Sequence, residues 1–201
     1  MYYNILDRRR TDLLPFLKEF KKDFYLAGRT GLALQIGHRS NIDFDFFNSK
    51  EFDIKKLLIR AKKALPNLSI IEQDEHTLII LVNDIKISFF YYPYKLINKT
   101  INQDNIRIAS IEDIACMKLS AILGRSTTKD YIDLYYILKD IKLITILSLA
   151  KKKFKELDNN LLLKSLIYFK DIEKERIYFR NNNYVDFEEV KDFIEKQVVS
   201  L

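Results

Sequence analysis

The apolar residues of the N-terminal half follow two different spacings. Recurrence every three or four residues is typical of an amphipathic helix, and it predicts helices over 10–22, 30–38 and 53–65, the last ending before Pro66. Alternating or short apolar runs are typical of strands, and they predict strands over 23–28, 41–47, 68–73, 76–83 and 85–93. Asn83 and Asp84, between the last two strands, favour a tight hairpin turn.

Beyond Pro93 the pattern becomes almost wholly helical. A short strand is predicted over 105–110, where Ser110 resembles a helix cap with Asp113 three residues further on. Helical spacing then covers 111–125, 128–141, 143–157, 161–177 and 186–199. We therefore predict an α+β protein, with a mixed-sheet core over about 1–109 and a helical lobe over about 110–201.

The composition fits a folded protein with a core of ordinary size. The chain has 201 residues, of which 48% are hydrophobic and 31% charged, and this balance argues against disorder. No apolar run approaches the roughly 18 residues of a membrane helix, and the N-terminus has no signal-peptide core, so we expect a cytoplasmic protein without membrane contact. The single cysteine, Cys116, excludes an internal disulfide, and the chain offers no zinc constellation.

The formal net charge of +6 permits a nucleic-acid partner without requiring one. Five of the basic residues lie close together, and no acid occurs between Asp53 and Glu72; they are Lys55, Lys56, Arg60, Lys62 and Lys63. This run has two interpretations: a solvated helix face, or a patch that faces phosphates beside the site described next.

Asp43 and Asp45 stand one residue apart in an apolar strand. Residues at this spacing project from the same face of a strand, so Ile42, Phe44 and Phe46 would face the core on the other side. Two neighbouring carboxylates are costly to bury unless a divalent cation binds them, and Mg²⁺ prefers carboxylate and phosphate oxygens. The alternative is an edge strand whose outer face is exposed to solvent, with both aspartates solvated.

Three of the chain's four glycines, Gly28, Gly31 and Gly37, come shortly before these aspartates. The segment "AGRTG" joins a predicted strand to a predicted helix, and such a junction presents backbone N–H groups and a positive helix end to a phosphate. Thr30 adds a hydroxyl and Arg39 a cation nearby. Together with the aspartates, this turn indicates a site for metal–nucleotide chemistry.

The segment "FYLAGRTGLALQIGHRSNIDFDFF" resembles the signature of DNA polymerase β-like nucleotidyltransferases, and more narrowly that of the abortive-infection toxins of AbiEii/AbiGii type. Two further segments match the same family, "IKISFFYYPYKLI" and "ASIEDIACMKLSAILGRSTTKDYIDLYYIL", so the resemblance extends over about 24–138. It implies a polymerase-β-like core with a lobe that completes the active site. It also implies Mg²⁺ or Mn²⁺ on Asp43 and Asp45, and an NTP as substrate.

Two positions depart from the family pattern. Arg29 stands where the family has a second glycine, so either its side chain contacts a phosphate or the turn receives phosphate less well. The neighbouring strand, expected to supply a third acid, has Ser88 at the candidate position, and Asp84 lies in the hairpin turn.

The helical lobe could supply the rest of the site. By resemblance, Lys118 matches a phosphate-binding cation, and Asp130 matches a third acid or a general base. Arg125 lies seven residues beyond Lys118, on the same face of a continuing helix. The alternative is a surface network of salt bridges, in which Asp133 would organise Lys129 or Arg125. The aromatic strand end at Tyr91, Tyr92 and Tyr94 could stack on a base or simply pack.

The resemblance implies the toxin of a toxin–antitoxin or phage-defence system, with a cognate antitoxin as partner. Some relatives modify the acceptor end of tRNA, so an RNA acceptor is plausible, while a protein or small-molecule acceptor stays open. The competing hypothesis is a degenerate relative that binds nucleotide or a partner without catalysis, since Arg29 and Ser88 depart from the pattern.

Overall fold

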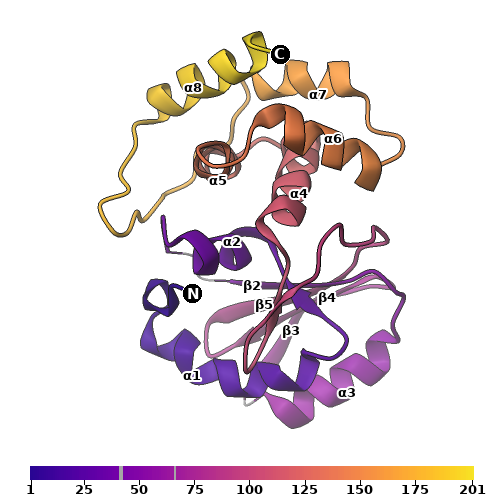
Figure 1. Cartoon of the computed structure of the whole chain (residues 1–201). Helices are drawn as coiled ribbons and strands as arrows, with labels where there is room; N and C mark the ends of the chain where they lie inside the picture. The colour runs from indigo at the N-terminus through magenta and orange to yellow at the C-terminus, as the bar shows by residue number, and fades with distance from the viewer. Residues whose placement is uncertain (41–42, 66) are drawn as a thin grey trace.

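The computed structural model describes residues 1–40, 43–65 and 67–201 (Figure 1). Ile42, expected on the core face of its strand, and Pro66, expected to end a helix, lie outside the described residues. The strands form one seven-stranded sheet in the order β3-β4-β5-β2-β1-β7-β6. The bounds are β1 Tyr25–Leu26, β2 Phe44–Asn48, β3 Leu68–Gln73, β4 Thr77–Val82, β5 Ile85–Tyr91, β6 Ile101–Asn102 and β7 Arg107–Ile108.

The sheet is mixed, as predicted. β2 runs parallel to β5 and β1 parallel to β7, while the other neighbouring pairs are antiparallel. Asn83 and Asp84 join β4 to β5 with φ angles of 50° and 64°, the left-handed conformation that a two-residue hairpin turn requires. This confirms the predicted hairpin. β6 was not predicted, because a two-residue strand at a sheet edge leaves no period in the sequence.

The helices confirm most of the predicted pattern. Their bounds are α1 Arg8–Leu17, α2 Gly28–Ile36, α3 Ile54–Ala64, α4 Ile111–Gly124, α5 Thr128–Leu138, α6 Leu143–Lys153, α7 Asn159–Leu166 and α8 Phe187–Val199, with short 3-10 helices at Tyr3–Ile5 and Lys18–Phe20. Ser110 caps α4 by accepting a hydrogen bond from the Asp113 amide, and Gly37 ends α2 at φ 69°. No helix in the described part of the chain is long and apolar enough to cross a membrane.

One helix prediction was wrong in extent. The helical pattern over 161–177 gives only α7, which ends at Leu166, and the chain then runs without regular structure to α8. In this segment Glu173 exchanges backbone hydrogen bonds with Ser126 and Thr128, which replace the bonds of a helix. Its apolar side chains pack on the helical lobe in this extended form, so tertiary contacts outweigh local helix propensity.

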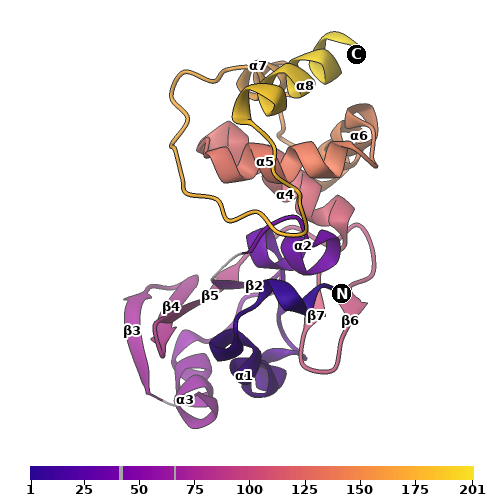
Figure 2. The same ribbon diagram turned by 90° about the vertical axis from the view of Figure 1, so that its left-hand side faces the viewer.

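The sheet separates two hydrophobic clusters. α1 and α3 cover one face, with Phe44, Phe46 and Phe89 of the sheet packed beneath them. α2 and the helices α4–α8 lie over the other face (Figures 1 and 2). The last strand ends at Ile108 and α4 begins at Ile111, near the predicted boundary, although the division into two domains stays a prediction.

The basic helix α3 lies on the face of the sheet opposite the helical lobe. Its apolar side packs on the sheet, its lysines are exposed, and Arg60 pairs with Asp23 at 2.6 Å. Asp43 and Asp45 face away from this helix, so the proposal of a phosphate-facing patch beside them is contradicted. The lysines of α3 form a solvated face.

Candidate active site

Between the sheet and the helical lobe lies a pocket of about 590 Å³. Asp43 and Asp45 line it from the sheet, and Lys118, Arg125 and Asp130 line it from the lobe. Gly28 and Arg29 line it from the start of α2. The pocket therefore brings together seven of the nine residues singled out as catalytic or nucleotide-binding, while Thr30 and Arg39 do not line it.

Asp45 lies on β2 and Asp43 directly before it, and both side chains line the pocket, on the face that the alternation predicted. Phe44 and Phe46 are buried on the opposite face, and Phe47 continues the pocket side. Ser88 of β5 stands directly across from Asp45 in the parallel register, at the position expected for a third acid. Lys86, two residues earlier on the same face, places its Nζ 3.4 Å from Asp43 Oδ2. Lys86 was not predicted as part of the site, although its even spacing from Ser88 places it on this face.

Burial and the neighbouring charge of Asp43 raise the pKa of the Asp45 carboxyl. Lys86 and a hydrogen bond with Ser88 act in the opposite direction without cancelling this effect. A raised pKa means that ionised Asp45 is held at a cost, and a divalent cation on the pair would remove that cost. Among the described residues there is no group of three or more acidic, histidine or cysteine ligands. The aspartate pair and the Ser88 hydroxyl fit a Mg²⁺ or Mn²⁺ ion that completes its coordination with substrate phosphates and water.

The glycine turn lies against Asp45. Gly28 has φ 61°, which favours glycine, and a Cβ built on it would meet Asp45 Oδ2 at 3.4 Å. Ala27 precedes α2 and gives the helix no side-chain cap, so a ligand can accept from the first amides of α2. Thr30 is buried, and its hydroxyl donates to the backbone carbonyl of Asp43. Thr30 thus ties the turn to the strand, which contradicts the prediction that its hydroxyl meets a phosphate.

Arg29 is held by the segment that follows α7. Its guanidinium donates to both carboxylate oxygens of Glu175, at 2.9 and 2.6 Å, and to Thr127 Oγ1 at 3.0 Å. Lys129 Nζ also donates to Glu175 at 3.0 Å. Partial burial acts to raise the pKa of Glu175, but the nearby Thr127, the hydrogen bond from Lys129 and the charge of Arg29 outweigh it, and that pKa lies below its usual value. Nothing in the sequence indicated Glu175, because 161–177 was predicted to be helical.

Lys118 joins the pocket to a buried ion cluster in the lobe. Its Nζ lies 2.7 Å from Asp130 Oδ1 and 2.6 Å from Asp133 Oδ2. Asp130 also accepts a hydrogen bond from Thr127 Oγ1 at 2.9 Å. All four side chains are buried or nearly so, and Asp130 reaches within 3.9 Å of Arg29. The arrangement fixes the orientation of the Asp130 carboxylate where it meets the pocket.

Arg39 is fully buried, and this contradicts the prediction that it binds nucleotide. Its Nε and Nη2 donate to the two oxygens of Asp133, each at 2.7 Å. Asp133 therefore organises Arg39 and Lys118, not Lys129 or Arg125 as expected. Full burial acts to raise the pKa of Asp133, but the charges of Arg39 and Lys118 outweigh it and hold that pKa well below its usual value.

His38 belongs to the same cluster, at 2.8 Å between its Nε2 and Asp133 Oδ1. Burial lowers the pKa of His38, so its ring is neutral near pH 7 and donates to the ionised Asp133. This contact could not be predicted from the spacing of residues, because His38 and Asp133 are far apart in the chain.

Metal binding is expected to stabilise the protein in a pH-dependent way. Because Asp45 has a raised pKa when folded, the folded state holds more protons than the unfolded state between the two pKa values, and stability falls as pH rises through that window. Bound Mg²⁺ or Mn²⁺ requires the ionised pair, so its stabilising effect should grow from acid to neutral pH. At ten times its Kd the ion should add about 1.4 kcal/mol, or about 3–6 °C in melting temperature.

Thermal unfolding with and without metal across this pH range would measure the effect. The exposed Asp12 offers a matched control, since Asp12→Asn should keep the metal shift and Asp45→Asn should lose it. An equal shift in wild-type protein and Asp45→Asn would contradict binding at the pair.

A family model described as "Nucleotidyl transferase AbiEii toxin, Type IV TA system" matches residues 16–194. An uncharacterised protein of Aquifex aeolicus is 40% identical over 184 residues, which cover 88% of this chain and 86% of that protein. Among solved structures, MenT4, a nucleotidyltransferase toxin of Mycobacterium tuberculosis, superposes with a TM-score of 0.66 at 12% identity, over 96% of this chain and 82% of MenT4. JHP933 of Helicobacter pylori superposes with a TM-score of 0.59 at 21% identity, over 97% of this chain and 92% of JHP933. At such identities the structures show a shared fold.

Proposed function

This chain belongs to the AbiEii family of nucleotidyltransferase toxins, and from that premise we propose that it transfers a nucleotide from an NTP to an acceptor hydroxyl with the help of a divalent metal ion. One observation carries the proposal. Asp43 and Asp45 of the sheet face Lys118 and Asp130 of the lobe across a single pocket, beside the glycine turn at Gly28.

Each residue has a role in this proposal. Asp43 and Asp45 would hold Mg²⁺ or Mn²⁺, which when bound neutralises phosphate charge and favours attack by a hydroxyl. The triphosphate would lie against Gly28 and the first amides of α2. Asp130, oriented by Lys118 and Thr127, would accept the proton of the attacking hydroxyl. The hydroxyl oxygen would bond to the α-phosphate as the bond to the β-phosphate breaks, and pyrophosphate would leave.

The cations of the pocket would bind the rest of the triphosphate. Arg125 at the end of α4 is exposed and lines the pocket. Arg29 lines it as well, and a phosphate would share or replace the contact with Glu175. Lys118 would act mainly through Asp130 and Asp133, because both carboxylates already contact its ammonium group. The helical lobe would in this way complete the active site.

The family also supports a biological role. We propose that the protein is the toxin of a toxin–antitoxin pair that acts in phage defence, and that a cognate antitoxin restrains it. The acceptor would be an RNA, with the 3′ end of tRNA as the first candidate. A hydroxyl of a protein or of a small molecule would be served by the same chemistry.

A second candidate is binding of nucleotide without transfer. Two observations favour it: Ser88 stands where a third acid is expected, and Arg29 of the turn is engaged by Glu175. In that case the pocket would bind an NTP as a ligand, and the aspartate pair would contribute only to affinity.

Incubation of the purified protein with each labelled NTP, total RNA and Mg²⁺ or Mn²⁺ tests the proposal. We expect label to enter an RNA species with at least one of the four nucleotides, and to require the metal. No incorporation under any of these conditions would sink the transferase proposal for RNA. Calorimetric binding of NTP that persists unchanged in Asp45→Asn, again without turnover, would favour the second candidate.

A further inference from the structure

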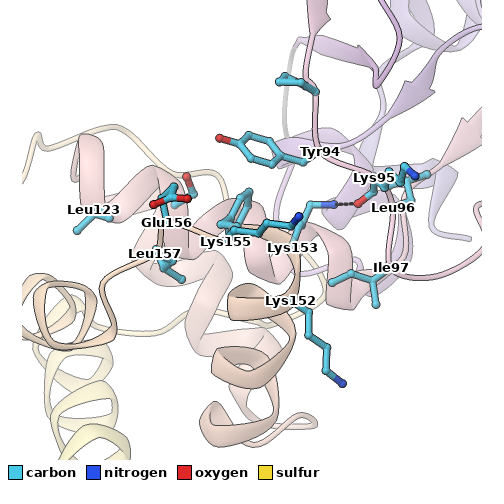
Figure 3. Close-up of a pocket in the computed structure, with 13 residues that line it drawn as sticks. Tyr94, Lys95, Leu96, Ile97, Leu123, Lys152, Lys153, Lys155, Glu156 and Leu157 are labelled. Carbon is cyan, nitrogen blue, oxygen red and sulfur yellow. Dashed lines mark hydrogen bonds between the residues drawn. The ribbon is translucent and has the colours of Figure 1, made fainter.

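A second pocket, of about 880 Å³, lies beside the candidate active site and has no role in the function proposed above. It opens between the chain that follows β5, the helix α4 and the end of α6 (Figure 3). We name it the lysine pocket and define it by Tyr94, Lys95, Ser120, Lys152, Phe154 and Lys155.

A buried ion pair holds the lysine pocket in shape. Lys153 of α6 contacts Asp113 of α4 at 2.7 Å, and both side chains are fully buried. Lys153 also donates to the backbone carbonyl of Lys95 at 2.8 Å, the dashed line in Figure 3. Asp113 accepts from the backbone amides of Ile97 and Asn98. The loop after β5 is therefore fixed to two helices, and the pocket is preformed.

The floor of the lysine pocket is aromatic and apolar. The rings of Tyr94 and Phe154 meet edge to face with centroids 4.7 Å apart. Leu96, Leu123 and Leu157 complete this lining. Such a floor can receive the flat face of a nucleobase.

The rim of the lysine pocket carries positive charge. Lys95, Lys152 and Lys155 are exposed, and among the described residues none of them forms an ion pair. Among the described residues that line this pocket Glu156 is the one acid, so the rim keeps a positive charge overall. Ammonium groups around an apolar floor suit a ligand that has phosphates on either side of a flat ring.

The two pockets adjoin. Ser120 of α4 lines both of them. Tyr92 lines the candidate active site and Tyr94 the lysine pocket, and their ring centroids are 4.9 Å apart. A nucleic-acid strand whose end lies near Asp43 and Asp45 could thus continue directly into the lysine pocket.

We propose that the lysine pocket binds a single-stranded segment of a nucleic-acid acceptor, with a base on Tyr94 and phosphates on Lys95, Lys152 and Lys155. The inference rests on the proposed transfer function and gives its acceptor a place. It predicts that the acceptor is recognised through single-stranded nucleotides next to the reacting end. An acidic protein segment would satisfy the lysines but not the aromatic floor.

Fluorescence anisotropy with a labelled single-stranded RNA tests this proposal. The rim variant combines Lys95→Ala, Lys152→Ala and Lys155→Ala, and the control combines Lys55→Ala, Lys62→Ala and Lys63→Ala on α3, with the same loss of charge on the opposite face of the sheet. We expect the rim variant to bind RNA at least about tenfold more weakly. Its plot of log affinity against log salt should be less steep, by about 2 in slope, while the control should change little in affinity or slope. Tyr94→Leu should weaken binding by about tenfold at constant charge.

Several outcomes would overturn the proposal. These are equal losses in the rim and control variants, tighter binding of duplex than of single-stranded RNA, or displacement of RNA by a poly-glutamate peptide at equal charge concentration. Transfer assays separate this inference from the function it rests on. If wild type transfers nucleotide and the rim variant does so with an unchanged KM for the acceptor, only the lysine pocket fails. If RNA binds through the rim but no nucleotide is transferred, only the transfer function fails.

Discussion

Asp45→Asn is expected to reduce nucleotide transfer by on the order of a thousandfold or more. The substitution removes one of the two carboxylates proposed to bind the metal ion. Among the described residues of the pocket, Asp43 and Asp130 are then the remaining carboxylates. The fold should survive. Burial and the charge of Asp43 raise the pKa of Asp45, so replacing the carboxylate with a neutral amide relieves a cost in the folded state.

Initial rates of incorporation with saturating NTP would measure this effect, and melting temperature would check the fold. Asp12→Asn changes charge equally on the exposed face of α1 and should leave the rate unchanged. A rate within tenfold of wild type for Asp45→Asn would contradict the role of the pair. A large fall in melting temperature would instead assign the loss to unfolding.

The aspartate pair and its neighbours could be predicted from the sequence because their signals are local. The period of two placed Asp43 and Asp45 on one face. The resemblance to the family singled out Ser88 on the neighbouring strand, where it lies across from Asp45. Gly28 stood between a predicted strand and a predicted helix, where a left-handed residue is common. The orientation of the two aspartates and the backbone of Gly28 both depend on residues within a few positions along the chain.

The buried cluster around Asp133 could not be predicted in this way. His38 and Arg39 follow a helix end, where charged residues are normally solvated, and their partner lies on α5 far along the chain. Sequence spacing instead suggested Lys129 as the partner of Asp133, one helical turn away. Tertiary packing decided otherwise, because a fully buried carboxylate needs charged partners that pack around it, which here are Arg39 and Lys118, while Lys129 pairs with Glu175.

The role of Arg29 in the structure differs clearly from the role that the sequence suggested. Arg29 stands where the family has a glycine, and arginine resists the left-handed backbone that a glycine turn often requires. Within this turn only Gly28 takes that conformation, and Arg29 lies within α2. Its side chain joins the turn to the segment after α7 through Glu175. The departure from the family pattern therefore fastens the C-terminal part of the lobe to the N-terminal end of α2.

Asp133→Asn is expected to lower the free energy of unfolding by about 3–5 kcal/mol, because it leaves Arg39 and Lys118 buried with one compensating charge fewer. The low pKa of Asp133 in the folded state means that its contribution is present above the pKa of an unfolded aspartate, and is lost as pH falls toward the folded value. Lowering the pH should therefore reduce the difference in free energy of unfolding between Asp133→Asn and wild type.

Urea unfolding followed by circular dichroism would measure the difference. Asp140→Asn, at an exposed position just beyond α5, is the matched control and should shift stability by less than about 0.5 kcal/mol. Adding Arg39→Met to Asp133→Asn should cost less than the sum of the two single changes, since the second removes the cation that the first left unpaired. Two results would show that the cluster of Arg39, Lys118 and Asp133 does not stabilise the contact between the lobe and the end of α2. These are additive losses of stability in the double variant, or a loss below about 1 kcal/mol for Asp133→Asn.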